Sequence, residues 1–281
     1  MLLLAAIAIP LGLDLYLPVP EENPLTAEKI ELGRRLFFDR RLSRDGSLAC
    51  ASCHDPERAY SDGRSVAVGV SGRIGRRNSP ALINRVYGRL FFWDGRAASL
   101  EEQVLLPIQD SDEMNLSLAE ASARVGLAPG EISHALATFV RSILSGNSRF
   151  DQFVNGDRNA LSAEEQAGLQ LFRGKANCTA CHVGPNFTDE RLHNTGIAWR
   201  DGRFADSGAG HGDFKTPTLR EIARTAPYMH DGSLATLNAV VEYYNRGGNG
   251  NPQLDPELHP LHLSEGEKRN LIQFLRSLST R

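Results

Sequence analysis

The chain has 281 residues, of which 41% are hydrophobic and 23% are charged. This length is enough for roughly two domains, and the composition is typical of a globular protein. The formal net charge of −3 gives no basic surface, so we expect no nucleic-acid partner. Beyond the N-terminus no apolar stretch reaches the ~20 residues that a membrane-spanning helix needs, so we expect no integral membrane protein.

The first ten residues, MLLLAAIAIP, form a short apolar run. The sequence Ala6-Ile7-Ala8 is typical of a cleavage site for an export signal, whereas the basic residues that usually begin such a signal are missing. Two interpretations stay open: residues 1–20 are an export-signal remnant, or they form an apolar strap on the surface. We favour export.

The first predicted helix begins after Thr26, which caps it, with Glu28 in its first turn. Its buried side chains recur at helical spacing. They are Ile30, Gly33, Leu36 and Phe37. After a long loop rich in Gly, Arg and Ser (residues 62–79), a second helix at roughly 130–144 closes this first unit.

The same order of elements returns in the second half of the chain. Ser162 and Glu165 form a capping box at the start of one helix, and Ser264 and Glu267 form another. The matching positions are Leu36-Phe37 with Leu171-Phe172, and Leu136-x-x-Phe139 with Leu271-x-x-Phe274. We therefore predict a duplicated helical unit.

Each half contains one C-x-x-C-H motif, and together the two motifs use all 4 cysteines. Two thiols at i and i+3 lie on one side of a short helical turn and can form thioethers to haem vinyl groups. The histidine that follows then binds the iron. The predicted haem-binding residues are Cys50, Cys53, His54, Cys178, Cys181 and His182.

The duplication and the haem motifs predict an all-α fold of two cytochrome c-like domains, each with one covalent c-type haem. The predicted N-terminal domain spans residues 21–155 and the C-terminal domain spans residues 156–281. The boundary falls in the polar, Gly-containing stretch around Asn155–Asn159.

Further motifs accompany the haem motifs in a fixed order. They are Arg77-Asn78-Ser79-Pro80, Phe91-Phe92-Trp93-Asp94-Gly95-Arg96, Leu100-Glu101-Glu102-Gln103, Asp112-Glu113-Met114, Thr216-Pro217-Thr218-Leu219-Arg220 and Thr225-Ala226-Pro227-Tyr228-Met229-His230-Asp231-Gly232. With them, the chain from about Leu25 to its end resembles the bacterial di-haem cytochrome c peroxidase family, which includes the MauG-type enzymes. The resemblance implies an enzyme that reacts with hydrogen peroxide at the N-terminal haem.

The resemblance also implies roles for individual residues. Glu113, 20 residues after Trp93, stands at the family's catalytic glutamate position, with Gln103 and Pro107 at other positions of the peroxide pocket. A carboxylate in an apolar pocket can move a proton between the two peroxide oxygens. Trp93 matches the tryptophan that exchanges electrons between the haems, and Arg96 a partner for a haem propionate. The implied calcium ligands, all oxygen donors, come from Asn78, Thr225 and Pro227.

Two departures from many peroxidases of the family distinguish the two haems. Val70 occupies the place of a histidine that caps the resting iron, which predicts a five-coordinate first haem that needs no prior reduction. Tyr244, 19 residues after Thr225, occupies the place of a methionine ligand, as in the MauG branch. Tyrosinate stabilises oxidised iron, whereas Met favours the reduced state. Tyr243 and Met229 stay open as alternative ligands.

The favoured function is a MauG-like oxidoreductase that activates hydrogen peroxide and oxidises a protein or other organic donor through the second haem. One alternative is a conventional cytochrome c peroxidase fed by a small cytochrome or cupredoxin, and another is a non-catalytic electron carrier. Covalent haem predicts export to the periplasm. We expect His211 and His230 to be hydrogen-bonding groups, and His134, His193, His259 and His262 to be structural or solvated.

Overall fold

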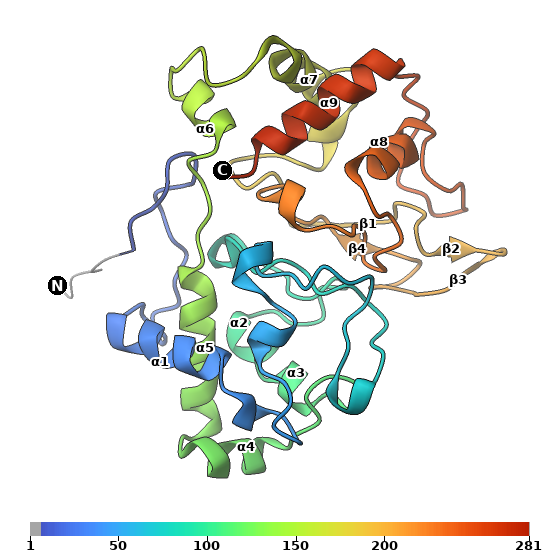
Figure 1. Cartoon of the computed structure of the whole chain (residues 1–281). Helices are drawn as coiled ribbons and strands as arrows, with labels where there is room; N and C mark the ends of the chain where they lie inside the picture. The colour runs from blue at the N-terminus through green and yellow to red at the C-terminus, as the bar shows by residue number, and fades with distance from the viewer. Residues whose placement is uncertain (1–6, 281) are drawn as a thin grey trace. The chain divides into compact units, whose positions relative to one another are not determined.

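The structure, a computed structural model, describes residues 7–280, so the first six residues of the predicted export-signal remnant lie outside the described part. Helices are its main regular elements (Figure 1). They are α1 (Ala27–Phe37), α2 (Leu100–Gln103), α3 (Leu106–Gln109), α4 (Leu118–Val125), α5 (Pro129–Ser142), α6 (Arg149–Val154), α7 (Ala163–Arg173), α8 (Leu237–Asn245) and α9 (Glu265–Ser277).

Two short antiparallel ribbons accompany the helices. They pair β1 (Leu192–His193) with β4 (Phe214–Lys215) and β2 (Trp199–Arg200) with β3 (Arg203–Phe204). The second ribbon turns at Asp201 and Gly202, whose φ angles of 51° and 77° are typical of a two-residue hairpin turn. The all-α prediction is therefore too strict, because helices make up only 37% of the chain and strands are present.

The chain forms two compact units, each with one C-x-x-C-H motif. The first consists mainly of Asp14–Phe91 and Ala97–Leu144, and the second of Pro10–Leu13, Phe92–Arg96 and the chain from Ser145 onward. The short segment Phe92–Arg96 therefore folds with the second unit, although the chain on both sides of it belongs to the first.

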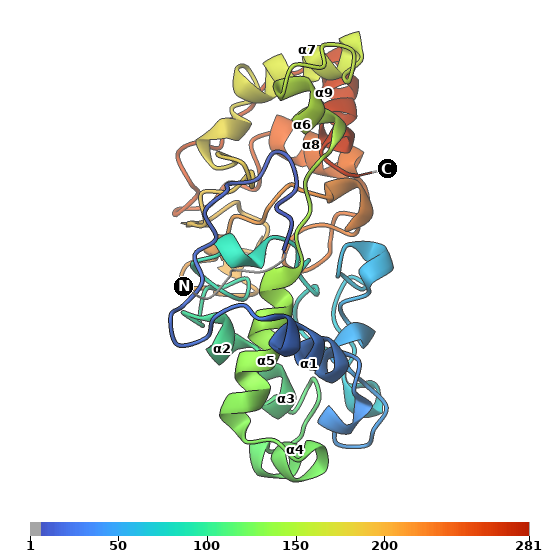
Figure 2. The same ribbon diagram turned by 90° about the vertical axis from the view of Figure 1, so that its left-hand side faces the viewer.

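In the first unit, α1 and α5 cross where their backbones come very close (Figure 2). A Cβ atom added to Gly33 would overlap the carbonyl oxygen of Ala135 and lie 2.7 Å from the Cβ of Phe139. One turn further along α1, the ring centroid of Phe37 lies 5.0 Å from that of Phe139. Only a residue without a side chain allows this crossing, which buries the two aromatic rings together.

The second unit repeats this crossing with α7 and α9. A Cβ atom added to Gly168 would overlap the carbonyl oxygen of Asn270 and lie 2.8 Å from the Cβ of Phe274. Four residues after the glycine, the ring of Phe172 lies 5.1 Å from that of Phe274. The two helix pairs thus share both the close approach and the aromatic contact, as a duplicated unit predicts.

The predicted starts of three helices are confirmed by their caps. The side-chain oxygens of Thr26, Ser162 and Ser264 each accept a hydrogen bond from the backbone N–H three residues further on. Glu165 and Glu267 return the contact by accepting from the backbone N–H of their capping serines, both at 2.8 Å. Each capping box therefore satisfies donors that a helix start otherwise leaves unpaired.

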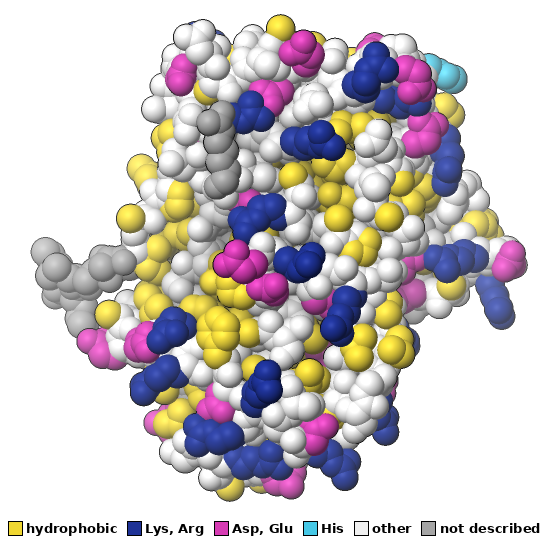
Figure 3. All heavy atoms as spheres, viewed as in Figure 1, with side chains coloured by type: hydrophobic (Ala, Val, Ile, Leu, Met, Phe, Trp, Pro, Cys, Tyr) yellow, Lys and Arg dark blue, Asp and Glu magenta, His cyan; other side chains and the backbone are white. Residues whose placement is uncertain are grey.

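The surface carries interspersed charges rather than a patch of one sign on the face drawn in Figure 3, which is in keeping with the small net charge. Within residues 7–280, no helix is both long and apolar enough to cross a membrane.

Candidate active site and cofactor sites

The first C-x-x-C-H motif forms a tight helical turn, Cys50–Ser52, that places His54 directly after it. The Nδ1 of His54 lies 3.0 Å from the carbonyl oxygen of Tyr60. Because a carbonyl can only accept, Nδ1 carries the proton, and Nε2 keeps the lone pair that an iron needs. Burial lowers the pKa of His54, which further favours the neutral, metal-binding form.

The second motif repeats this arrangement. Cys178–Ala180 forms the turn, and the Nδ1 of His182 donates to the carbonyl oxygen of Phe187 at 2.9 Å. Burial lowers the pKa of His182 as well. Both acceptor residues, Tyr60 and Phe187, have positive φ angles (59° and 52°) that non-glycine residues seldom adopt. The chain thus holds a strained conformation at each motif to aim a carbonyl at the histidine.

All four cysteines are free thiols, as attachment to two haems requires. They lie on half-buried turns. Burial is the main cause that raises the pKa of Cys50 and Cys178 to about 12 and that of Cys53 to about 11. Two vicinal thiols followed by an oriented, neutral imidazole therefore fit a covalently bound haem at each motif.

The predicted peroxide pocket of the first unit is built on α2, α3 and the turn after them. Gln103 ends α2 and Pro107 lies in α3. The backbone N–H of Met114 donates to the carbonyl oxygen of Pro107 at 3.1 Å, which brings the neighbouring Glu113 beside this helix. Negative charge on Glu113 adds to the rise in the pKa of Cys50, so Glu113 lies near the first haem motif.

Val70, the predicted replacement for a capping histidine, lies against Glu113. Its backbone N–H donates to the carbonyl oxygen of Glu113 at 2.8 Å, and its side chain is buried with 2% of its surface exposed. An apolar side chain without a donor atom therefore stands at the position where the family resemblance predicts a capping histidine in many peroxidases.

The two adjacent tyrosines of α8 differ in how their hydroxyl groups are used. The Tyr243 hydroxyl donates to the carbonyl oxygen of Thr195 at 2.8 Å and accepts from the backbone N–H of Asn249 at 3.1 Å. Burial raises the pKa of Tyr244, and charges on Tyr243, Cys181 and Cys178 add to this rise. Tyr244 therefore lies near the second haem motif, whereas Tyr243 has its hydrogen-bonding capacity filled.

Met229, the other alternative ligand, packs against the hydrophobic core of the second unit. Its φ angle is 74°, so its conformation is set by the turn in which it lies. This turn also holds the cis peptide bond Ala226–Pro227 and the antiparallel bridge between Tyr228 and Leu234. Core packing accounts for Met229 without a role as an iron ligand.

Trp93 folds with the second unit. Its carbonyl oxygen accepts a hydrogen bond from the backbone N–H of Lys215, in β4, at 2.7 Å. Arg96, four residues before the start of α2, lies with its guanidinium 3.5 Å from the ring centroid of Phe92 and pairs with Asp94 at 2.9 Å. The Phe92–Arg96 segment is thus held by cation–π and ion-pair contacts of its own.

The residues expected at the calcium site offer the oxygen donors that this ion prefers. Asn78 is buried, and its side-chain N–H donates to the carbonyl oxygen of Arg64 at 2.7 Å, which orients the amide. Thr225 and Pro227 lie in the second unit, where the Thr225 hydroxyl donates to the carbonyl oxygen of Ile222 at 3.4 Å. Their role as calcium ligands stays a prediction.

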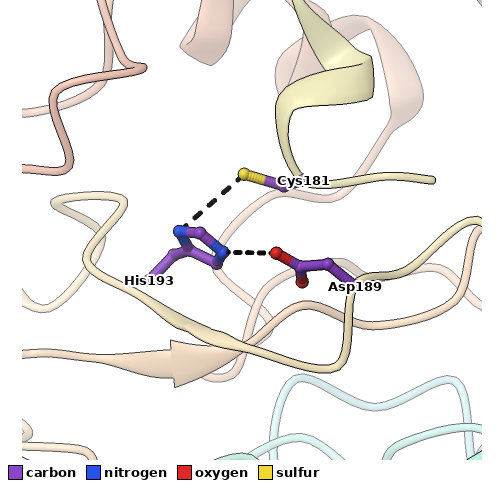
Figure 4. Close-up of side chains that lie close together, drawn as sticks. All are labelled: Cys181, Asp189 and His193. Atoms are coloured by element: carbon purple, nitrogen blue, oxygen red, sulfur yellow. Dashed lines mark hydrogen bonds and ion pairs between the residues drawn. The ribbon is translucent and has the colours of Figure 1, made fainter.

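His193, predicted to be structural or solvated, lies half-buried between two carboxylates. Nε2 is 2.9 Å from Asp189 and Nδ1 is 2.5 Å from Asp255. The Sγ atom of Cys181 lies 3.8 Å from Nδ1 (Figure 4). Contacts with Cys181, Asp255 and Asp189 raise the pKa of His193 to about 10, so a positive charge stands beside the second motif. No spacing of residues in the sequence could have identified this contact.

Comparisons with known proteins show the family to which the chain belongs. The family model described as di-haem cytochrome c peroxidase matches residues 27–130. The methylamine utilization protein MauG of Methylorubrum extorquens is 42% identical, over 93% of this chain and 81% of its own length. The cytochrome c551 peroxidase of Nitrosomonas europaea is 32% identical, over 93% of this chain and 83% of its own. The chain therefore belongs to the di-haem cytochrome c peroxidase family, whose members are oxidoreductases.

A solved structure supports the fold. It is described as a MauG-like protein associated with microbial copper homeostasis, and it matches 98% of this chain and 96% of its own with a TM-score of 0.86 and 33% identity. The family resemblance predicted from the motifs is thus confirmed, and with it the class of enzyme. Membership of a di-haem family implies haem of c type, which the two motifs fit.

Proposed function

We propose that the chain is a MauG-like oxidoreductase that cleaves hydrogen peroxide in the first unit and oxidises a donor through the second. The observation that carries this proposal is the place of Glu113, near Cys50 and bonded through its backbone to Val70. A carboxylate near the first haem motif, beside an apolar residue that offers no ligand atom, fits the acid–base cleavage of a peroxide.

Glu113 would take the proton from one peroxide oxygen and deliver it to the other. The O–O bond then breaks heterolytically, and the protonated oxygen leaves as water. Gln103 and Pro107 would shape the pocket around the peroxide, and His54 would hold the cofactor through Nε2, with Tyr60 fixing the orientation of its ring. A haem held there would supply the two electrons that this cleavage needs and would keep the resulting oxidising equivalents.

Tyr244 would hold the haem iron of the second unit together with His182. The filled hydrogen bonds of Tyr243 and the core packing of Met229 support this choice. Ligation needs the tyrosinate form, and burial opposes it by raising the pKa of Tyr244; the positive charge of a bound iron would offset that cost. An anionic oxygen ligand stabilises oxidised iron, which suits a haem that shares oxidising equivalents with the first through Trp93.

The conventional cytochrome c peroxidase is the second candidate, because a cytochrome c551 peroxidase matches the chain over the same span as MauG. Its donor would be a small cytochrome or cupredoxin, whereas the MauG-like function takes electrons from a protein or other organic substrate. Rapid peroxide-dependent turnover with reduced cytochrome c551 would favour this candidate, and slow turnover would favour the MauG-like one.

The test of the proposal is the reaction of the oxidised holoprotein with hydrogen peroxide, followed by stopped-flow absorption. We expect Glu113→Gln to slow it by about 10²- to 10⁴-fold, as loss of a general acid–base group does. Glu31→Gln, which alters an exposed carboxylate of α1, is the matched control and should react at the wild-type rate. A Glu113→Gln variant that reacts as fast as wild type would overturn the proposal.

We also propose export to the periplasm and one calcium ion held by Asn78, Thr225 and Pro227. Export is supported by the covalent haem motifs, since such haem is normally attached outside the cytoplasm. Prolonged dialysis against a calcium chelator should slow the reaction with peroxide, and added calcium should restore it. Metal analysis of the purified protein that finds no calcium would contradict the second part.

A further inference from the structure

The loop that contains Val70 is a small hairpin of its own, residues 67–77. The backbone N–H of Ala67 donates to the carbonyl oxygen of Arg77 at 3.0 Å, and that of Gly75 donates back to Ala67 at 2.8 Å. Nearer the tip, the N–H of Gly69 donates to the carbonyl oxygen of Arg73 at 2.8 Å. These hydrogen bonds within the hairpin stabilise its shape, so its residues are displaced together.

The tip of this hairpin lies on the Asp112–Glu113 peptide. The backbone N–H of Val70 donates to the carbonyl oxygen of Glu113, and the Arg73 guanidinium pairs with the Asp112 carboxylate at 3.2 Å. Gly69 is buried at the contact. A Cβ atom added to it would overlap the carbonyl oxygen of Asp112 and lie 2.7 Å from that of Glu113.

Gly69 is needed here for space and not for its backbone conformation. Its φ and ψ angles of −85° and −172° are open to any residue. The absent side chain lets the hairpin backbone approach the two carbonyl groups on either side of the Glu113 amide. Gly72, at the tip, is needed for its backbone conformation and not for space. Its φ is +72°, and nothing lies within 4 Å of an added Cβ atom.

None of residues 67–77 has a side chain that binds haem iron, since the segment reads AVGVSGRIGRR. A change in the oxidation state of iron therefore has no ligand in this hairpin to release or capture. The contacts with Asp112 and Glu113 hold the tip of the hairpin in place.

We propose that the 67–77 hairpin is a fixed clasp that positions Glu113, and that Gly69 is the positioning residue that makes the contact possible. This inference rests on the proposed role of Glu113 in peroxide cleavage. It adds that Glu113 is positioned through the backbone contacts of a segment that contains no ligand for iron.

The experiment compares Gly69→Ala with Gly72→Ala in the holoprotein. Gly69→Ala must push the hairpin away from Asp112 and Glu113, and we expect a roughly 10- to 100-fold lower rate constant for the reaction with peroxide, the usual cost of displacing a catalytic group by about 1 Å. Gly72→Ala strains the same hairpin without touching Glu113 and should retain a rate within about threefold of wild type.

Two further measurements separate positioning from general damage. The pH at which the peroxide rate changes should shift in Gly69→Ala, because Glu113 leaves its surroundings; loss of active protein alone would lower the rate without moving that pH. Hydrogen exchange of the Val70 amide should be faster in Gly69→Ala than in wild type. In wild type it should be equal in the oxidised and reduced holoprotein.

A second variant, Arg73→Gln, keeps the test open if Gly69→Ala does not fold. The Arg73–Asp112 pair is exposed, so its loss leaves folding intact, and we expect a two- to fivefold lower peroxide rate with faster exchange at Val70. Arg73→Lys should restore most of the rate.

The outcomes distinguish this inference from the proposed function. If Glu113→Gln is slow while Gly69→Ala and Arg73→Gln react at the wild-type rate, the clasp is refuted and the role of Glu113 stands. If Gly69→Ala and Gly72→Ala are slowed equally, strain in the hairpin explains the effect and the inference fails. If Glu113→Gln reacts at the wild-type rate, the proposed function fails, and the inference fails with it.

Discussion

The two haem motifs have nearly the same surrounding helices and turns, here called the frame, but different neighbouring side chains. In each unit a glycine lets two helices cross closely, Gly33 in one and Gly168 in the other, and a pair of phenylalanines packs one turn away. In each, a carbonyl group from a residue with positive φ orients the haem histidine. The shared features are those that hold a haem.

The neighbours of the cysteines separate the two motifs. Near Cys53 stand the backbone N–H of Val68, in the clasp hairpin, and the carboxylate of Glu113. Near Cys181 stand the ring of His193 and the phenol of Tyr244. A duplicated frame thus has two different surroundings, which come from the loop or helix that each unit places near its cysteines.

The largest effect is expected from making the second motif resemble that of a conventional peroxidase. If Tyr244 is the ligand proposed above, Tyr244→Met exchanges an anionic oxygen ligand for a thioether, which favours reduced iron, so we expect the reduction potential of the second haem to rise on the order of a few hundred millivolts. Potentiometric titration followed by absorption spectroscopy measures the shift.

Tyr243→Phe is the matched control for Tyr244→Met. It removes a buried hydroxyl that bonds to Thr195 and Asn249, so it should lower the free energy of unfolding by about 1–2 kcal/mol and leave the potential nearly unchanged. If Tyr243→Phe moved the potential and Tyr244→Met did not, the ligand would be Tyr243.

The shared frame can be broken in one unit at a time. Gly33→Ala and Gly168→Ala each place a methyl group against a backbone carbonyl of the partner helix, and each should lower the free energy of unfolding by about 3 kcal/mol. Hydrogen exchange should show the loss of protection in the altered unit alone, whereas urea denaturation measures the size of the effect.

Gly130→Ala and Gly266→Ala serve as the paired controls. Both glycines are the second residue of the partner helix, α5 or α9, and neither has a heavy atom within 3.4 Å of an added Cβ atom. Alanine is the better helix former, so these variants should be neutral or more stable by a few tenths of a kcal/mol. Equal losses of unfolding free energy in all four variants would show that the close helix crossings are no more sensitive to a methyl group than the control positions.

The frame could be predicted from the sequence because it depends on local signals. Caps such as Ser162 and Ser264, the C-x-x-C-H turns and the helical spacing of Leu36 and Phe37 act within a few residues of one another. The β2–β3 hairpin also had such a signal, Asp201-Gly202 between Trp199-Arg200 and Arg203-Phe204, which the helical interpretation overlooked.

The residues that lie near the cysteines of each haem motif could not be predicted in this way, because contacts between distant parts of the sequence bring them there. Nothing near His193 in the sequence indicates Asp255, 62 residues away, or the 3.8 Å approach to Cys181. Likewise, the segment around Trp93 belongs to the second unit, where the backbone N–H of Lys215, more than 100 residues away, donates to the Trp93 carbonyl oxygen. The role of Glu113 was predicted from a family resemblance, and its contact with Val70 needed the structure.

Acid should weaken the first unit through Glu101. Its side chain, 19% exposed, accepts hydrogen bonds from Arg141 and from Asn23, the latter at 2.6 Å. Burial tends to raise the pKa of Glu101, but these hydrogen bonds outweigh it and lower the pKa to about 2. A lowered pKa means that the stabilisation is complete above the ordinary pKa of 4.5 and is lost as the pH falls toward 2.

Between pH 5 and pH 2, the free energy of unfolding should therefore fall by about 2 kcal/mol less in Glu101→Gln than in wild type. Urea denaturation at a series of pH values measures it, and Glu22→Gln, which alters an exposed carboxylate before the start of α1, is the control. A Glu101→Gln variant as acid-sensitive as wild type would place the titrating group elsewhere.

The smallest effect is expected at His193, at the other end of the pH scale. Contacts with Cys181, Asp255 and Asp189 raise its pKa to about 10, so its stabilising contribution is complete below the ordinary value of 6.5 and is lost as the pH rises toward 10. A thioether at Cys181 carries no charge, which leaves the two carboxylates as the cause and moves the loss to a somewhat lower pH.

His193→Gln should remove about 1 kcal/mol of stability at pH 7 and less at pH 10, measured by urea denaturation of the holoprotein. Because His193 touches only the second motif, the same titration should leave hydrogen exchange in the first unit unchanged; a matching change there would mean that the two motifs are less independent than their neighbours suggest.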